Sequence, residues 1–218
     1  YQRGFFDDLI SPFNGVERDG IMRDTPIEKL ARLKPAFDRE NGTLTAANST
    51  TLTDGAAAVL LASEDWAAEH RLPVQAYLSF SEVAAVDFYS QGSDSEGLLM
   101  APAYAVPRLL ERAGINLQDF DFYEIHEAFA AQTLCTIKAW EDAEFCKNKL
   151  GLDSPLGSID RNKLNVNGSS VATGHPFAAT GPRIISTLAK LLEQKGQGRG
   201  LISICAAGGQ GVTAILER

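Results

Sequence analysis

The chain of 218 residues has few cysteines, no long apolar run and no excess of positive charge. Its three cysteines form an odd count without CxxC spacing, which excludes a disulfide scaffold and favours a reducing compartment. No apolar stretch approaches the roughly 18 residues that a membrane-spanning helix needs. The net charge of −8 argues against nucleic acid or an anionic membrane as a general partner.

Histidine and methionine are scarce too. The three histidines are scattered without the spacing of metal ligands, so we expect no metal site. The chain begins with Tyr1, and its two methionines are Met22 and Met100, so we expect a part of a longer translation product. A targeting segment is therefore not visible, and the expected location is the cytoplasm of a bacterium or an organelle of a eukaryote.

Strand-like and helix-like segments alternate, which predicts a layered α/β fold. Apolar runs predict strands at 74–80, 121–125, 201–205 and 212–216. The apolar run at 56–62 is short enough for a buried strand, although its alanines and leucines also fit a helix. Apolar periodicity and capping residues predict helices at 25–33, 64–70, 102–113, 127–140 and 183–195. Thr25 and Ser63 are the expected N-caps of the first two helices, and Pro107 is placed in the first turn of the third. The last two strands should pair as a hairpin.

Residues 165–183 hold one histidine, His175, among glycines and small residues, directly before a helix. Small residues let the backbone bend sharply and let a ligand approach closely. One interpretation places His175 at the floor of a pocket. The other is a structural turn whose histidine only caps the backbone, and this stretch by itself fits both.

Two further reactive side chains end predicted strands, where open α/β folds build their sites. His126 follows the strand at 121–125, and Cys205 ends the strand at 201–205. A lone cysteine is most often a small buried hydrophobe. The glycine-rich loop at 206–211 instead offers backbone N–H groups for an oxyanion, and a thiol beside an imidazole could exchange protons with a carbon acid.

Four motifs, in order and spacing, resemble the signatures of thiolases and cover essentially the whole chain. They are TAAN through DGAAA at 45–58, HEAFA at 126–130, NGSSVATGHP at 167–176 and CAAGGQG at 205–211. His126 stands where most thiolases have asparagine, which resembles the branch of the trifunctional-enzyme β-subunit and related bacterial 3-ketoacyl-CoA thiolases. The resemblance implies the C-terminal half of a duplicated, layered α/β fold. It assigns 1–42 to a remnant of the CoA-binding loop region, 43–71 to the end of the N-terminal domain and 72–218 to the C-terminal domain.

The resemblance also implies roles by position. His175 would activate a nucleophilic cysteine and contribute to an oxyanion hole. Cys205 would exchange a proton with Cα of the acetyl unit, and His126 would position a water or the thioester oxygen. The resemblance further assigns backbone N–H groups of the second oxyanion hole to Ala207 and Gly208, and substrate contacts to Thr50, Arg23 and Phe177.

The implied activity is that of an acyl-CoA acetyltransferase, which cleaves 3-ketoacyl-CoA with CoA or runs the reverse Claisen condensation. Coenzyme A would be a substrate, with no permanently bound cofactor. The expected assembly is a homodimer or homotetramer, or a complex with a hydratase/dehydrogenase subunit. His126 and Phe177 favour, by resemblance, the branch that degrades fatty acids.

One feature of thiolases has no match, because no residue here stands in the motif of the nucleophilic cysteine. Cys135 is expected within a helix facing the core, and Cys146 lies in a charged stretch. We therefore expect the nucleophile upstream of Tyr1 and the chain alone to be inactive. The alternative is a non-catalytic CoA-binding or assembly module with the same fold.

Overall fold

The main sheet has four strands in the order β2–β6–β5–β3. The computed structural model describes residues 1–90 and 95–218. The strands are β2 (Tyr77–Ala85), β3 (Phe122–Ile125), β5 (Arg199–Ala206) and β6 (Gln210–Glu217). β3 runs parallel to β5, whereas β5 and β6 form the predicted antiparallel hairpin and β2 pairs antiparallel to β6.

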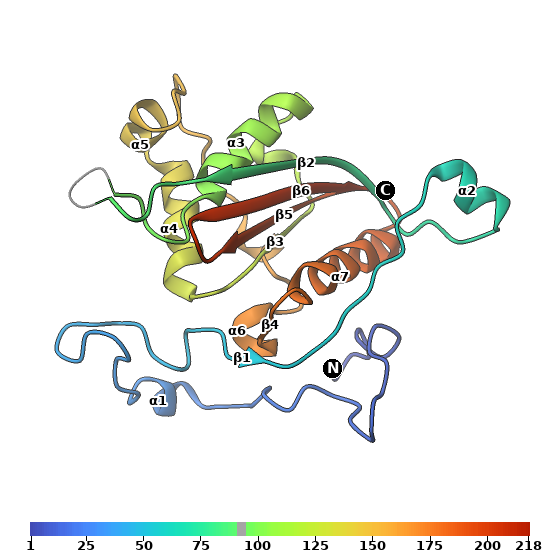
Figure 1. Cartoon of the computed structure of the whole chain (residues 1–218), viewed down its shortest axis with the longest axis horizontal. Helices are drawn as coiled ribbons and strands as arrows, with labels where there is room; N and C mark the ends of the chain where they lie inside the picture. The colour runs from blue at the N-terminus through green and yellow to red at the C-terminus, as the bar shows by residue number, and fades with distance from the viewer. Residues whose placement is uncertain (91–94) are drawn as a thin grey trace.

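Helices cover both faces of this sheet (Figure 1). Alternate residues of β5 point to opposite faces: Leu201 joins the cluster under α3 (Pro102–Ala113) and α4 (Ala130–Glu141), and Ile202 joins the cluster under α7 (Thr180–Lys195). This period-2 division of apolar residues is what a sheet buried on two faces requires. The layered α/β prediction is confirmed.

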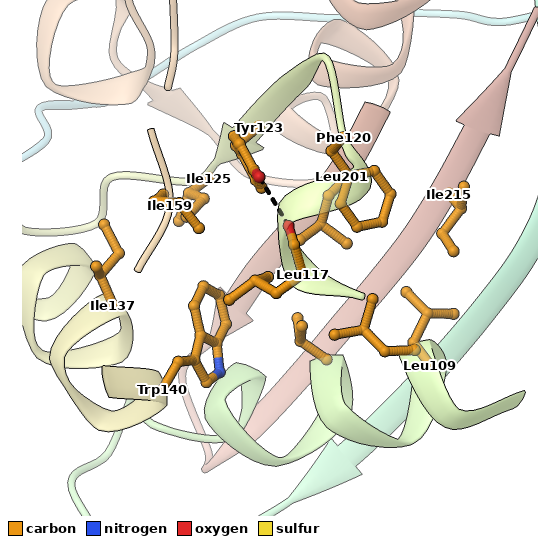
Figure 2. Packing of buried hydrophobic residues seen from close by; sticks show 12 residues of the cluster. Leu109, Leu117, Phe120, Tyr123, Ile125, Ile137, Trp140, Ile159, Leu201 and Ile215 are labelled. Carbon is orange, nitrogen blue, oxygen red and sulfur yellow. Dashed lines mark hydrogen bonds between the residues drawn. The ribbon is translucent and has the colours of Figure 1, made fainter. Parts of the chain in front are cut away.

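The larger core cluster lies between the sheet and helices α3 and α4 (Figure 2). Tyr123 is buried there and donates its hydroxyl hydrogen to the Leu117 carbonyl at 2.7 Å. The sequence pattern placed Pro107 in the first turn of α3, and this prediction is wrong, because Pro107 lies inside the helix. Proline has no N–H for the carbonyl of Ala103 four residues earlier, and the Nε1–H of Trp140 donates to that carbonyl instead, at 3.4 Å.

Residues 1–76, which we call the N-terminal arm, run along the sheet domain with little structure of their own (Figure 1). Phe5 and Ala67 are its buried residues. The arm contains α1 (Ile27–Leu30), β1 (Leu52–Thr53) and α2 (Glu64–Glu69). The remaining short elements are α5 (Ala143–Asn148), α6 (Ser170–Thr173), β4 (His175–Pro176) and the 3₁₀ turns η1 (Leu117–Asp119) and η2 (Arg161–Lys163).

Several sequence predictions are wrong in the arm. The apolar run 56–62 forms neither the strand nor the helix that the sequence allowed, and it is largely exposed, with Leu60 at 73%. No strand within the described residues pairs with it. Thr25 does not cap α1, whose N-cap is Pro26 and whose length is one turn. Ser63, by contrast, is confirmed as the N-cap of α2, accepting a hydrogen bond from the backbone N–H of Trp66.

Helix α4 begins at Ala130, later than the predicted start at residue 127. The backbone before it is extended and bound to the arm: Thr50 N–H donates to the Ala128 carbonyl at 3.0 Å, and Ala130 N–H donates to the Asn48 carbonyl at 2.9 Å. Pairing with the arm therefore replaces the first helical turn. Within the described residues, no helix has both the length and the apolarity to cross a bilayer.

Candidate active site

His126, His175 and Cys205 come from separate elements and line one cavity of about 420 Å³. His126 follows β3, His175 begins β4, and Cys205 lies near the end of β5. The wall between them is mostly apolar and is completed by residues of the arm. Other lining residues include Phe37, Thr50, Phe129, Phe177, Ala206 and Ala207.

His175 is held by its backbone and by its Nδ1 atom. Its N–H donates to the carbonyl of Thr51 at 2.8 Å, and Nδ1 lies 2.6 Å from Oγ1 of Thr180. The Thr180 hydroxyl also has the Pro176 carbonyl as an acceptor at 3.2 Å, so Nδ1 of His175 can carry the hydrogen of the pair. Nε2 is then left with a lone pair, as a base requires. Burial, followed by the charge of Arg183, lowers the pKa of His175 and favours the neutral ring.

The backbone before His175 approaches the arm closely. Gly174 has φ +82°, and a Cβ placed there would lie 2.7 Å from Cγ2 of Thr53 and 2.6 Å from Cδ1 of Ile21. Both the conformation and the space demand glycine. This close approach lets β4 pair in parallel with β1, with His175 opposite Leu52.

His126 is buried, and its ring centroid lies 4.3 Å from that of His175. Its Nδ1 is 2.7 Å from the Ser170 hydroxyl oxygen. Burial, followed by the proximity of His175 and Arg183, lowers the pKa of His126 to about 3. The imidazole is therefore neutral at physiological pH and acts as a hydrogen-bonding group, not as a cation.

Cys205 is buried against α4, and its thiol donates to Oε1 of Gln132 at 3.5 Å. Burial raises the pKa of the Cys205 thiol to about 12, against the opposing effect of backbone hydrogen bonds from Cys205 and Ala128. The side chain is thus both a buried group and a lining residue of the cavity. At neutral pH it holds its proton, which is the form that a proton donor needs.

The predicted substrate contacts and oxyanion donors divide into two groups. Thr50, Phe177 and Ala207 line the cavity, whereas Arg23 is exposed and Gly208 lies in the β5–β6 turn, outside the lining residues. The Thr50 hydroxyl donates its hydrogen to the Ser170 carbonyl at 2.7 Å, so toward a ligand it can only accept. The Phe177 ring is 69% exposed, with its centroid 4.9 Å from that of His175.

The other two cysteines do not reach this cavity. Cys135 is exposed on α4, so the prediction that it faces the core is wrong. Cys146 is buried, and its thiol lies within hydrogen-bonding distance of the carbonyls of Ala139 and Trp140. Of the three cysteines, only Cys205 lines the cavity.

Sequence reasoning missed a polar layer beneath the histidines. The Arg183 guanidinium donates from Nη1 to the Gly174 carbonyl and from Nη2 to Ser170 Oγ, both at 2.9 Å. Burial, followed by the charge of Glu127, raises the pKa of Glu124 to about 8, and its Oε1 has no hydrogen-bond partner among the described residues. The available signals were a carboxyl group inside an apolar strand and an arginine inside the small-residue motif.

Glu127 ties the loop after β3 to the His175 loop. Its Oε1 accepts from Nδ2 of Asn165 at 2.8 Å, and its Oε2 accepts from the backbone N–H of Val171 at 3.1 Å. In the part of the chain that the structure describes, no cluster of three or more His, Cys, Asp or Glu side chains could hold a metal ion.

Comparisons with known proteins identify the family of the chain. Residues 2–65 match the family described as "Thiolase, N-terminal domain", and residues 81–218 match "Thiolase, C-terminal domain". A 3-ketoacyl-CoA thiolase of Yersinia pestis is 44% identical over 224 aligned residues, which cover 100% of this chain and 50% of the relative.

Two solved structures are similar to this chain in their fold. Human mitochondrial 3-ketoacyl-CoA thiolase in complex with CoA superimposes with a TM-score of 0.77 at 31% identity, over 99% of this chain and 50% of that one. The dimeric peroxisomal thiolase of Saccharomyces cerevisiae superimposes with a TM-score of 0.79 at 34% identity, over 100% and 50%. The chain thus spans about half the length of these relatives. On both the sequence matches and the fold, the chain belongs to the thiolase family.

Proposed function

We propose that this chain forms the C-terminal half of an acetyl-CoA C-acyltransferase that cleaves 3-ketoacyl-CoA with CoA, or runs the reverse condensation. The observation that carries the proposal is the convergence of His126, His175 and Cys205 on one cavity. These side chains come from three different motifs and supply a hydrogen-bond donor, a base and an acid. The relatives named 3-ketoacyl-CoA thiolase support the substrate class.

In the cleavage direction, the first half-reaction begins with a cysteine supplied from outside this chain. Nε2 of His175 takes the thiol proton, and the thiolate attacks the 3-keto carbon. The C2–C3 bond then breaks, its electron pair passes to C2 of the acetyl thioester, and the Cys205 thiol donates its proton to C2. The products are acetyl-CoA and an acyl-cysteine, with His175 protonated and Cys205 a thiolate.

The second half-reaction restores both groups. The thiol of a new CoA gives its proton to the Cys205 thiolate, and its sulfur attacks the acyl-cysteine carbonyl. The enzyme's cysteine leaves and regains its proton from His175. Negative charge on the reacting oxygens is met by His126, with His175, and by the backbone N–H groups of Ala207 and Gly208.

The remaining assignments belong to the same proposal. Thr50 and Phe177 contact the substrate at the cavity, and Arg23 meets the nucleotide end of CoA. No cofactor is held permanently. The assembly is a homodimer or homotetramer, supported by the dimeric yeast relative, or a complex with a hydratase/dehydrogenase subunit. The expected location is the bacterial cytoplasm or an organelle, and the domains divide at about residues 42 and 71.

The test compares this chain with the longer protein of which we propose it is a part, using 3-ketoacyl-CoA, CoA and detection of acetyl-CoA. The chain alone should give no turnover, and the longer protein should be active. Turnover by the chain alone, or a longer protein that binds CoA without turnover, would overturn the proposal. The second result would favour a non-catalytic CoA-binding module.

Substitutions in the longer protein separate the two chemical roles. Cys205→Ser should keep acyl transfer to the nucleophile but slow carbon–carbon cleavage by about 10²–10⁴, because a hydroxyl is too weak an acid. His175→Ala should slow both half-reactions and the labelling of the nucleophile by iodoacetamide. Wild-type cleavage by the serine variant would reduce Cys205 to a packing residue.

A further inference from the structure

Ser170 is fully buried and makes its side-chain hydrogen bonds to two groups of unlike chemistry. Nη2 of Arg183 lies 2.9 Å from the Ser170 oxygen, and Nδ1 of His126 lies 2.7 Å from it. The Arg183 guanidinium has donors only, so at this contact the serine oxygen must accept. The single hydroxyl hydrogen of Ser170 is then left for His126.

Counting hydrogens fixes the form of the His126 ring. If the Ser170 hydroxyl donates to Nδ1, that nitrogen is unprotonated and the neutral ring carries its hydrogen on Nε2. The opposite tautomer would direct the hydrogens of both Arg183 and Nδ1 at one serine oxygen. It would also leave the hydroxyl hydrogen of Ser170 buried without an acceptor among the described residues.

We propose that Ser170, held by Arg183, is a positioning residue that keeps His126 in the Nε2–H tautomer, so that His126 presents a hydrogen-bond donor to the substrate oxygen. This inference rests on the proposed function for its chemistry, but the tautomer itself does not. His175 can take the complementary form, with its hydrogen on Nδ1 beside Thr180 and a lone pair on Nε2, when the Thr180 hydroxyl donates to the Pro176 carbonyl. The paired rings, with centroids 4.3 Å apart, thus offer one donor and one acceptor.

The charges around Arg183 support this arrangement. Burial lowers the pKa of Arg183, whereas the charges of Asp19 and Glu127 act in the opposite direction and favour the cation. A charged donor also binds the serine oxygen more strongly than a neutral one would. The Arg183 guanidinium therefore strengthens Ser170 as a donor to His126 by polarising the hydroxyl.

The test is ¹⁵N NMR of the chain labelled in its histidines. In the wild type, Nδ1 of His126 should resonate as an unprotonated nitrogen and Nε2 as a protonated one. Ser170→Ala should produce averaged signals of the two tautomers. The matched control is Ser169→Ala, which removes a neighbouring buried hydroxyl that contacts the Ile125 carbonyl at 3.3 Å and no imidazole. A protonated Nδ1 in the wild type would overturn the proposal, as would unchanged signals in folded Ser170→Ala.

The consequence for catalysis is measured in the longer protein. Loss of a whole oxyanion-hole donor costs about 10²–10³ in kcat, and loss of tautomer control, with the ring still present, should cost about tenfold. KM should stay unchanged, and Ser170→Thr, which keeps a hydroxyl, should restore the NMR signature. An inactive wild type with the expected NMR signals would defeat the proposed function alone. An active wild type whose signals ignore Ser170→Ala would defeat the positioning role alone.

Discussion

The sheet domain, residues 77–218, and the N-terminal arm, residues 1–76, are held in place by different forces. The sheet domain buries two apolar clusters on opposite faces of its strands. The arm buries only Phe5 and Ala67 within the described residues, yet it supplies one wall of the cavity and the strand that pairs with β4. Segments with few buried apolar contacts open at low cost, so the site joins a rigid half to a weakly held one.

Removing apolar volume should separate the two regions most sharply. Trp140 is completely buried in the larger cluster, and Trp140→Ala should lower the free energy of unfolding by about 3–5 kcal/mol. Leu60 in the arm is 73% exposed, and Leu60→Ala should change the free energy of unfolding by no more than about 0.5 kcal/mol. Urea unfolding measures the free energy of unfolding of both variants. It is followed by far-UV circular dichroism, whose signal does not depend on the tryptophan that is removed. Equal losses would mean that the arm is as firmly packed as the sheet domain.

The same two regions show what the sequence could and could not predict. The apolar runs around 201–205 and 212–216 are buried by their own neighbours, so the hairpin was predictable. Helix α3 is followed by Gly114, whose φ of +66° is the left-handed conformation that glycine commonly adopts at the end of a helix. The run 56–62 is also apolar, but an apolar composition does not show whether other parts of the protein pack against the segment. It is exposed here.

The site follows the same division. His126, His175 and Cys205 stand at the ends of predictable strands or within a recognisable motif, so their meeting could be expected. The late start of α4 depends on hydrogen bonds to the arm from about 80 residues away, which no local pattern encodes. The bond between Ser170 and His126 likewise joins residues 44 positions apart. Local helix and strand propensities cannot predict hydrogen bonds between residues so far apart in the sequence.

A buried carboxyl group in the sheet domain should give a second contrast, in the pH dependence of stability. The pKa of Glu124 is raised from 4.5 to about 8 by burial, so the folded state binds this proton more tightly than the unfolded state. Its contribution to stability is full below pH 4.5 and is lost as the pH rises toward about 8.

Glu124→Gln removes that titration and keeps the shape of the side chain. The difference in Tm between variant and wild type should therefore move in favour of the variant as the pH rises through this window. Glu69→Gln on the exposed α2 is the matched control in the arm, and its difference from wild type should stay constant. A constant difference for Glu124→Gln would show that the carboxyl group does not titrate in this range. Differential scanning calorimetry across the pH series makes the measurement.

The smallest expected effect lies where the two regions meet. The Thr50 hydroxyl donates to the Ser170 carbonyl, and Thr50→Val removes this bond with little change in volume. One neutral hydrogen bond contributes about 0.5–1.5 kcal/mol, and here the loss should act locally, on the docking of the arm. Amide exchange of His175, whose N–H donates to the Thr51 carbonyl, should accelerate about tenfold, while the amides of β5 keep their rates. Thr51→Val, at the exposed neighbouring position, should change neither rate. If β5 exchanged faster as well, the arm and the sheet domain would open as one cooperative unit, and the division between a rigid and a weakly held half of the site would fail.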